Sequence, residues 1–266
     1  MIGKNQTWEL VERTQNRKVI GFKWVYKTKL KFDGSVNKYK ARRIVKGYAQ
    51  IWGVDYSETF APVARLDTIR LLLAIVAERN WKIYQLDVKS VFLNGVLEEE
   101  IYVEQLEGFE VKGAEGRVYK LRKGLYGLKQ APSAWYNKID TYLQNLKFEK
   151  SLSESTLYVK KEMDSIVILS LYVDDLLVTG DNKIQVEKLM GDLHKVFEMT
   201  DLGEMSYFLG MEVQQRKNEV FICQKKYLKE IMKKFKIEEC NSASTPMNLK
   251  EKLKKDDGSE KVISEL

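Results

Sequence analysis

The chain has 266 residues, of which 44% are hydrophobic and 31% charged, and its formal net charge is +7. This composition excludes an intrinsically disordered chain, and the length allows one large domain or two to three small ones. A basic balance suits a polyanionic partner such as nucleic acid. Cys223 and Cys240 fit neither a zinc site nor a disulfide framework, and no apolar run reaches the length of a membrane span. We therefore expect an intracellular protein with reduced thiols and no membrane partner.

The first clear element is a basic hairpin near the N-terminus. Over residues 22–32, strict alternation places Trp24, Tyr26 and further apolar residues on one face and lysines on the other. Asp33-Gly34 then predicts a tight turn. On the return strand, residues 35–46, one face carries Lys38, Lys40, Arg42 and Lys46. A solvated surface ribbon is the simpler interpretation of so many lysines.

Helices and strands then alternate, which favours an α+β fold with antiparallel hairpins. Helices are predicted over residues 66–81, 131–148, 183–197 and 224–235. Strands are predicted over 82–87, 165–180 as an apolar hairpin, 205–214 and 219–222. Glu98 to Glu100 is interpreted as a solvated acidic surface, and residues 108–116 as a loop. The charged residues 250–266 are expected to be poorly ordered.

Within the apolar hairpin lies the sequence Tyr172-Val173-Asp174-Asp175. Two adjacent carboxylates are rarely placed among apolar residues unless they are paired or bind metal. The pair is therefore either a solvated turn cap or a cation site. Asp87, at the end of the predicted strand 82–87, adds a third carboxylate. Carboxylates on neighbouring strands can hold two divalent cations, and oxygen ligands suit Mg²⁺.

Six ordered segments resemble the reverse transcriptase domain of Ty1/copia-type LTR retrotransposons. They are residues 40–50 (KARRIVKGYAQ), 85–95 (QLDVKSVFLNG), 124–136 (GLYGLKQAPSAWY), 171–180 (LYVDDLLVTG), 208–213 (FLGMEV) and 244–247 (STPM). Together they cover about residues 8 to 248. The resemblance implies a right-hand polymerase fold, with a palm of antiparallel sheet and helices, fingers carrying the basic hairpin, and a partial thumb. It also implies RNA- and DNA-directed DNA synthesis on a primed template.

The same resemblance implies a division of the chain. Fingers would comprise residues 1–85, with 112–130 returning to them, and the palm would comprise 86–111 and 131–213. Residues 214–248 would begin the thumb or a connection, and 249–266 would form a disordered charged tail.

Carried over by position, Asp87, Asp174 and Asp175 would be the catalytic carboxylates. Together with the Val88 carbonyl they would bind two Mg²⁺ ions, or Mn²⁺ in their place. Phe92 would sit under the sugar and reject a ribose 2′-hydroxyl, unless it is simply a core residue. The rest of the dNTP site would comprise Lys38, Lys40, Arg42, Tyr126 and Gly127.

Contacts with the RNA or DNA template-primer would come from two further regions. Lys129 would meet template phosphate, and Tyr172 would lie near the primer end. A segment resembling the primer grip contains Phe208, Leu209, Gly210 and Met211. Helix 224–235 would track duplex phosphates, or be a solvated helix face. His194 and both cysteines are interpreted as structural or solvated.

Three positions depart from the family pattern: Arg43 and Val96 replace an aliphatic and an acidic residue, and Leu106 replaces a proline. Arg43 faces the apolar side of the hairpin, so its guanidinium must snorkel or pair. None of these changes removes a catalytic carboxylate.

The integrase, protease and ribonuclease H of the parent polyprotein have no counterpart here, and about twenty residues follow Pro246. We therefore expect a chain that copies RNA without degrading it, located in a cytoplasmic virus-like particle if the parent element is active. The alternative is a catalytically inactive nucleic-acid-binding remnant. A calcium-binding hairpin has less support, because no calcium-loop pattern accompanies the aspartates.

Overall fold

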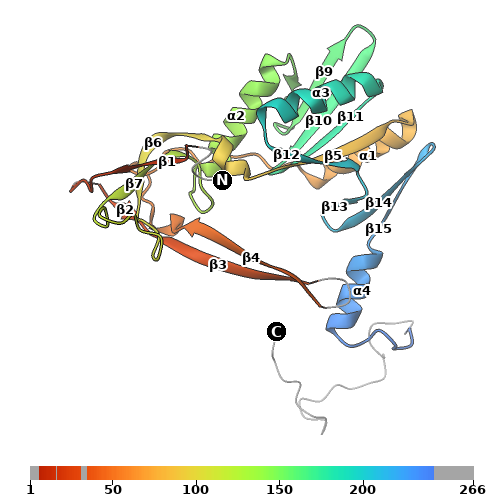
Figure 1. Ribbon diagram of the computed structural model, residues 1–266. Helices are drawn as coiled ribbons and strands as arrows, with labels where there is room; N and C mark the ends of the chain where they lie inside the picture. The colour runs from red at the N-terminus through yellow and green to blue at the C-terminus, as the bar shows by residue number, and fades with distance from the viewer. Residues whose placement is uncertain (1–5, 16, 31–34, 243–266) are drawn as a thin grey trace.

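The structure, a computed structural model, describes residues 6–15, 17–30 and 35–242 (Figure 1). The predicted turn at Asp33-Gly34, the 244–247 segment and the predicted tail 249–266 lie outside the described residues.

A six-stranded antiparallel sheet forms the centre of the molecule, in the order β12-β5-β11-β10-β9-β8. Its strands are β5 (Lys82–Val88), β8 (Glu149–Lys150), β9 (Leu157–Glu162), β10 (Ser165–Tyr172), β11 (Asp175–Gly180) and β12 (Met199–Glu204). Leu176 to Thr179 of β11 are all buried. A strand covered on both faces has apolar residues in succession rather than in alternation. The sheet is therefore the middle layer of a sandwich.

Helices α2 (Ala131–Asn145) and α3 (Lys183–Val196) cover one face of this sheet (Figure 1). Trp135, Ile139 and Leu143 of α2 pack there with Leu193 of α3. Pro132 lies in the first turn of α2, where a missing N–H is harmless. Asn182 caps α3 by accepting hydrogen bonds from two backbone N–H groups.

The opposite face is covered by α1 (Leu66–Arg79) and by a three-stranded sheet. That sheet comprises β13 (Tyr207–Phe208), β14 (Met211–Arg216) and β15 (Glu219–Cys223). The N-cap residue of α1, Arg65, makes no side-chain cap. Instead the buried carboxylate of Glu154 accepts from the Thr68 hydroxyl at 3.3 Å and from the Arg65 backbone. One predicted strand, 205–214, is wrong in its extent, because Leu209 and Gly210 turn back with φ of 48° and 84°.

A second sheet, which the sequence did not predict, has the order β1-β7-β6-β2. It comprises β1 (Trp8–Val11), β2 (Val19–Ile20), β6 (Val96–Val103) and β7 (Val118–Lys123). The acidic cluster lies in β6, where Glu98 and Glu100 are exposed as predicted. Glu100 forms ion pairs with Lys120 and with Arg17. The predicted loop 108–116 contains neither helix nor strand.

The basic hairpin is a separate ribbon of β3 (Phe22–Leu30) and β4 (Val36–Val45) (Figure 1). Lys27 pairs with Lys40 and Lys29 with Lys38, so the predicted lysine face is confirmed. The opposite, aromatic face is solvated over its outer part, where Tyr26 is 74% and Tyr39 80% exposed, whereas Phe22 packs against the core. Arg43 on this face lies 5.8 Å from the centre of the Trp24 ring, which is the pairing that its position required.

The predicted helix 224–235 forms as α4 (Lys225–Lys234), and none of its residues is buried. The α+β class is confirmed. The proposed division between fingers and palm at residues 85 and 86 falls inside β5, while α1 packs on the same sheet as β5.

Candidate active site

Strand pairing brings the three predicted carboxylates to one end of the central sheet. Asp87 of β5 lies directly opposite Asp175 of β11. Asp174 occupies the two-residue turn between β10 and β11, and its carbonyl accepts the Val88 N–H at 2.8 Å. Residues opposite each other in an antiparallel pair present their side chains on the same face. The register of β5 on β11 therefore assembles the acidic site.

The three carboxylates repel one another. Burial raises the pKa of the Asp175 carboxyl, and the charges of Asp174 and Asp87 raise it further. Gln85 opposes this shift by donating from Nε2 to Asp175 Oδ1 at 2.9 Å. Lys89 supplies a positive charge, with Nζ 2.6 Å from Asp87 Oδ1. A cluster of this kind is stabilised by a bound cation.

The donor set suits Mg²⁺, because all three side chains offer hard carboxylate oxygens. Among the described residues, no three acidic, histidine or cysteine side chains are yet gathered in a metal-binding arrangement. Asp87 is held by Lys89, and Asp175 by Gln85. Metal binding would turn these carboxylates away from their present partners. The Val88 carbonyl as a ligand stays a prediction.

Strand β4 contributes cations to this site. Burial lowers the pKa of Lys40, the charges of Arg42, Lys29 and Lys38 lower it further, and Asp87 acts in the opposite direction. The Arg42 guanidinium lies 5.7 Å from the centre of the Tyr126 ring. Burial, followed by the charge of Asp174, raises the pKa of Tyr126. Lys40 and Tyr126 thus lie within electrostatic range of the carboxylates, and Arg42 reaches the same place through its contact with Tyr126, whereas Lys38 lies farther along the ribbon.

Phe92 lies in the 3₁₀ helix η2 (Val91–Asn94) and packs edge-on against Tyr126, with ring centres 4.6 Å apart. It is half-buried rather than enclosed. With Trp135, Leu171 and Val173 it lines an apolar cavity of about 320 Å³. The structure therefore shows Phe92 as a wall facing open space, and its contact with a sugar stays a prediction.

The missing side chain of Gly127 makes room for β4. A Cβ at Gly127, whose φ is +98°, would lie 2.2 Å from the Val45 carbonyl oxygen. A Cβ at Gly47, in the 3₁₀ helix η1 (Gly47–Ala49), would lie 1.9 Å from the Gly127 oxygen. Val45 also donates its N–H to the Tyr126 carbonyl at 2.8 Å. This close backbone contact, which we call the glycine joint, attaches the ribbon to the rest of the site. The predicted approach of a nucleotide to Gly127 stays a prediction.

Lys129 is exposed and lies against Tyr56, with Nζ 2.9 Å from the hydroxyl and 4.6 Å from the ring centre. Its backbone N–H donates to the buried side chain of Gln50, which in turn donates to Gln130 at 2.9 Å. Sequence reasoning missed this pair of buried glutamines. They join the loop after η1 to the start of α2 and so hold Lys129 in place.

The residues resembling a primer grip divide into a buried and an exposed part. Phe208 is 2% exposed and packs edge-on against Tyr172, with ring centres 5.8 Å apart. The Phe208 side chain can support the turn that contains Asp174, but it is too deeply buried to contact a primer. Leu209 is exposed and forms the turn between β13 and β14 with Gly210, while Met211 begins β14 opposite Phe208.

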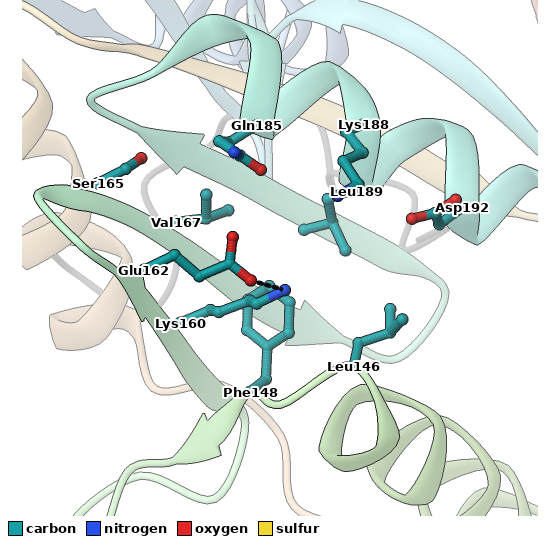
Figure 2. A pocket seen from close by; sticks show the side chains of 10 residues that line it. All are labelled: Leu146, Phe148, Lys160, Glu162, Ser165, Val167, Gln185, Lys188, Leu189 and Asp192. Carbon is teal, nitrogen blue, oxygen red and sulfur yellow. Dashed lines mark ion pairs between the residues drawn. The ribbon is translucent and has the colours of Figure 1, made fainter.

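The remaining candidates show no site. His194 is exposed on α3, and Cys223 and Cys240 are free thiols. A pocket between β9, β10 and α3 has a volume of only about 30 Å³, and the Lys160–Glu162 ion pair lines it (Figure 2). That volume holds one or two waters rather than a substrate. Among the described helices, none has the length and apolar character needed to cross a membrane.

Comparison with known proteins identifies the chain's relatives. Residues 5–249 match the family described as reverse transcriptase (RNA-dependent DNA polymerase). The chain is 42% identical over 247 residues to a retrovirus-related Pol polyprotein from transposon TNT 1-94 of Nicotiana tabacum, covering 92% of this chain and 19% of that protein. It is 38% identical over 244 residues to the Pol polyprotein from transposon RE1 of Arabidopsis thaliana, covering 91% and 17%. It is 26% identical over 264 residues to the transposon Ty1-ER2 Gag-Pol polyprotein of Saccharomyces cerevisiae, covering 93% and 14%. The chain thus spans less than a fifth of the length of these relatives.

Proposed function

The chain belongs to the reverse transcriptase (RNA-dependent DNA polymerase) family, and we propose that it is an active Mg²⁺-dependent polymerase that adds dNTPs to a primer 3′ end. One observation carries the proposal. Asp87 and Asp175 lie opposite each other with Asp174 at the adjoining turn, within electrostatic range of Lys40 on β4. Three carboxylates on one side and cations on the other suit a metal-bound triphosphate.

In this proposal Asp87, Asp174 and Asp175 bind two divalent ions, with the Val88 carbonyl as a further ligand. The ions would activate the primer hydroxyl and stabilise the leaving phosphate oxygen. Lys40 and Arg42 orient the triphosphate, with Lys38 farther out on the ribbon. Phe92 and Tyr126 form the wall beneath the sugar. Phe92 would exclude a 2′-hydroxyl by contact, with its ring packed edge-on against Tyr126.

Template and primer would approach from two sides. Lys129 and Tyr56 would meet the template backbone, while Leu209, Gly210 and Met211 would hold the primer end near Asp174. The exposed lysines of α4 would follow the duplex as the start of a thumb. We assign the fingers to the β1-β7-β6-β2 sheet and the ribbon, and the palm to the six-stranded sheet with α1, α2 and α3. We also propose that the chain resides in the cytoplasmic virus-like particle of its parent element, if that element is active.

Primer extension on poly(rA)·oligo(dT) with Mg²⁺ tests the assignment. Asp174→Asn should lower incorporation by about 100-fold or more, because it removes a metal ligand. Asp201→Asn is a matched control: Asp201 is exposed on β12, and its Oδ1 accepts the nearby Gly203 N–H at 2.8 Å. It should leave the rate unchanged. Incorporation that survives Asp174→Asn would reject the site, whereas a parent chain that binds primed template without extending it would support the inactive remnant.

A further inference from the structure

The backbone of Val173 is unusual for its residue type. Its φ is +55°, and it is the only β-branched residue among the described non-glycine residues with positive φ. It occupies the first position of the two-residue turn between β10 and β11. Turns of this length need positive φ there and normally use glycine or asparagine. Left-handed backbone is unfavourable for a β-branched side chain, so something outside the turn must offset the cost.

Two hydrogen bonds hold the turn from outside. The indole Nε1 of Trp135 donates to the Val173 carbonyl at 2.8 Å. The backbone N–H of Val88 donates to the next carbonyl, that of Asp174, at 2.8 Å. Both carbonyls of the turn are therefore fixed, one by α2 and the other by β5. The Asp174 carboxylate projects from between these two anchors.

Trp135 is well placed to act as a rigid donor. It is 2% exposed, and its ring packs edge-on against Phe197 with centres 5.4 Å apart. The indole can therefore not swing away from the turn without breaking the core around α2. Val173 and Trp135 also line the same apolar cavity of about 320 Å³, together with Phe92. The valine side chain forms part of this wall, which a glycine at the same position would not supply.

We propose that Trp135 is a positioning residue: its indole N–H holds Val173 in the left-handed conformation and thereby directs the Asp174 carboxylate into the acidic site. The catalytic part of this inference rests on the proposed polymerase function. The structural part, a coupling between Trp135 and the backbone of Val173, stands without it.

A double-mutant cycle tests both parts. Trp135→Phe keeps an aromatic ring against Phe197 but removes the donor, and Val173→Gly removes the conformational cost. Trp135→Phe should lower kcat for primer extension about five-fold in the Val173 protein, with little change in the KM for dNTP. In the Val173→Gly background the same substitution should change kcat less than two-fold. Whatever Val173→Gly costs by itself cancels in this comparison.

Unfolding by urea, without metal or substrate, gives the second readout. Trp135→Phe should lower the folding equilibrium constant several-fold more in the Val173 protein than in the Val173→Gly background. Tyr142→Phe is the matched control. Tyr142 also projects from α2, packs against Phe197 at 5.3 Å and donates to a carbonyl at 2.9 Å, but that carbonyl belongs to Asp192 of α3.

Tyr142→Phe should show no coupling to Val173→Gly in either assay. Equal effects of Trp135→Phe in both backgrounds, in extension and in unfolding, would show that Trp135 only fills the core and would overturn the inference. Coupling in unfolding in a parent chain that extends no primer would uphold the structural part and reject the proposed function. Coupling in unfolding without coupling in kcat would reject the catalytic part alone.

Discussion

The glycine joint predicts an ordered series of stability losses from three glycine-to-alanine substitutions. Gly53 has a φ of +75° but open space around its Cβ position, so Gly53→Ala tests the backbone cost alone. Gly47 lies outside the left-handed region, so Gly47→Ala tests the steric clash alone. Gly127, with φ of +98° and a contact of 2.2 Å, combines both.

The expected magnitudes follow from these contacts. Gly53→Ala should lower the free energy of unfolding by about 1–2 kcal/mol, the cost of a Cβ in left-handed backbone. Gly47→Ala must push the ribbon away from Gly127 and break the hydrogen bond from the Val45 N–H to the Tyr126 carbonyl. This should lower the free energy of unfolding by about 2–4 kcal/mol. Gly127→Ala should cost about 3–6 kcal/mol, since both effects act there. The smaller unfolded-state entropy of alanine is common to all three substitutions and leaves their order unchanged.

Equilibrium urea unfolding measures the series, with equal m values as the condition for comparing midpoints. The glycine joint positions strand β4, which contains Lys40 and Arg42. Gly47→Ala should therefore also raise the KM for dNTP about ten-fold, while Gly53→Ala should not. If Gly47→Ala were as mild as Gly53→Ala in unfolding, the backbone contact between Gly47 and Gly127 would not be as tight as described.

Other predictions concern single side chains. Burial raises the pKa of Glu154, but hydrogen bonds from Thr156, the Arg65 backbone and Thr68 outweigh it and hold the pKa below 4.5. Its stabilisation is therefore present above that pH and lost as the pH falls through the lowered pKa. Glu154→Gln should cost about 1–2 kcal/mol at pH 7, and in urea titrations this cost should shrink as the pH falls through the lowered pKa. Lys89→Gln frees Asp87 and should lower the Mg²⁺ concentration for half-maximal extension about two- to five-fold; a rise would mean that Lys89 assists metal binding. Phe92→Val should raise the ratio of kcat/KM for rNTP over dNTP about ten-fold or more, and an unchanged ratio would assign Phe92 to the core alone.

Much of the central layer could be predicted from the sequence, because its signals are local. The apolar run around Asp174 belongs to β10 and β11, and β11 is buried on both faces. Periodicity located the starts of α1, α2 and α3, where apolar residues recur on one face. The register of Asp87 against Asp175 needed the family resemblance, since no local pattern states which strands pair.

The missed parts depend on contacts between distant residues. Strands β1 and β2 are short, and β2 pairs in parallel with β6, about 80 residues away. The helical spacing of apolar residues on α2 predicts that Trp135 lies in the core. It cannot predict which carbonyl accepts the hydrogen bond from the indole N–H. The aromatic side of the ribbon looked like a buried face by alternation, yet only part of it is covered: Phe109 lies 6.5 Å from Trp24 between ring centres, whereas Tyr39 is 80% exposed.

The place of β5 in the central sheet has a consequence for synthesis on the ribosome. Both of its neighbours, β11 and β12, come much later in the chain, after β6, β7 and α2. At usual translation speeds β5 therefore waits on the order of 5–20 s with two unpaired edges before β11 emerges. During that interval an apolar strand is open to pairing with other nascent chains. Messages truncated before residue 175 would yield chains that keep both edges bare permanently, and such products should depend on chaperones or aggregate, whatever the state of their catalytic residues.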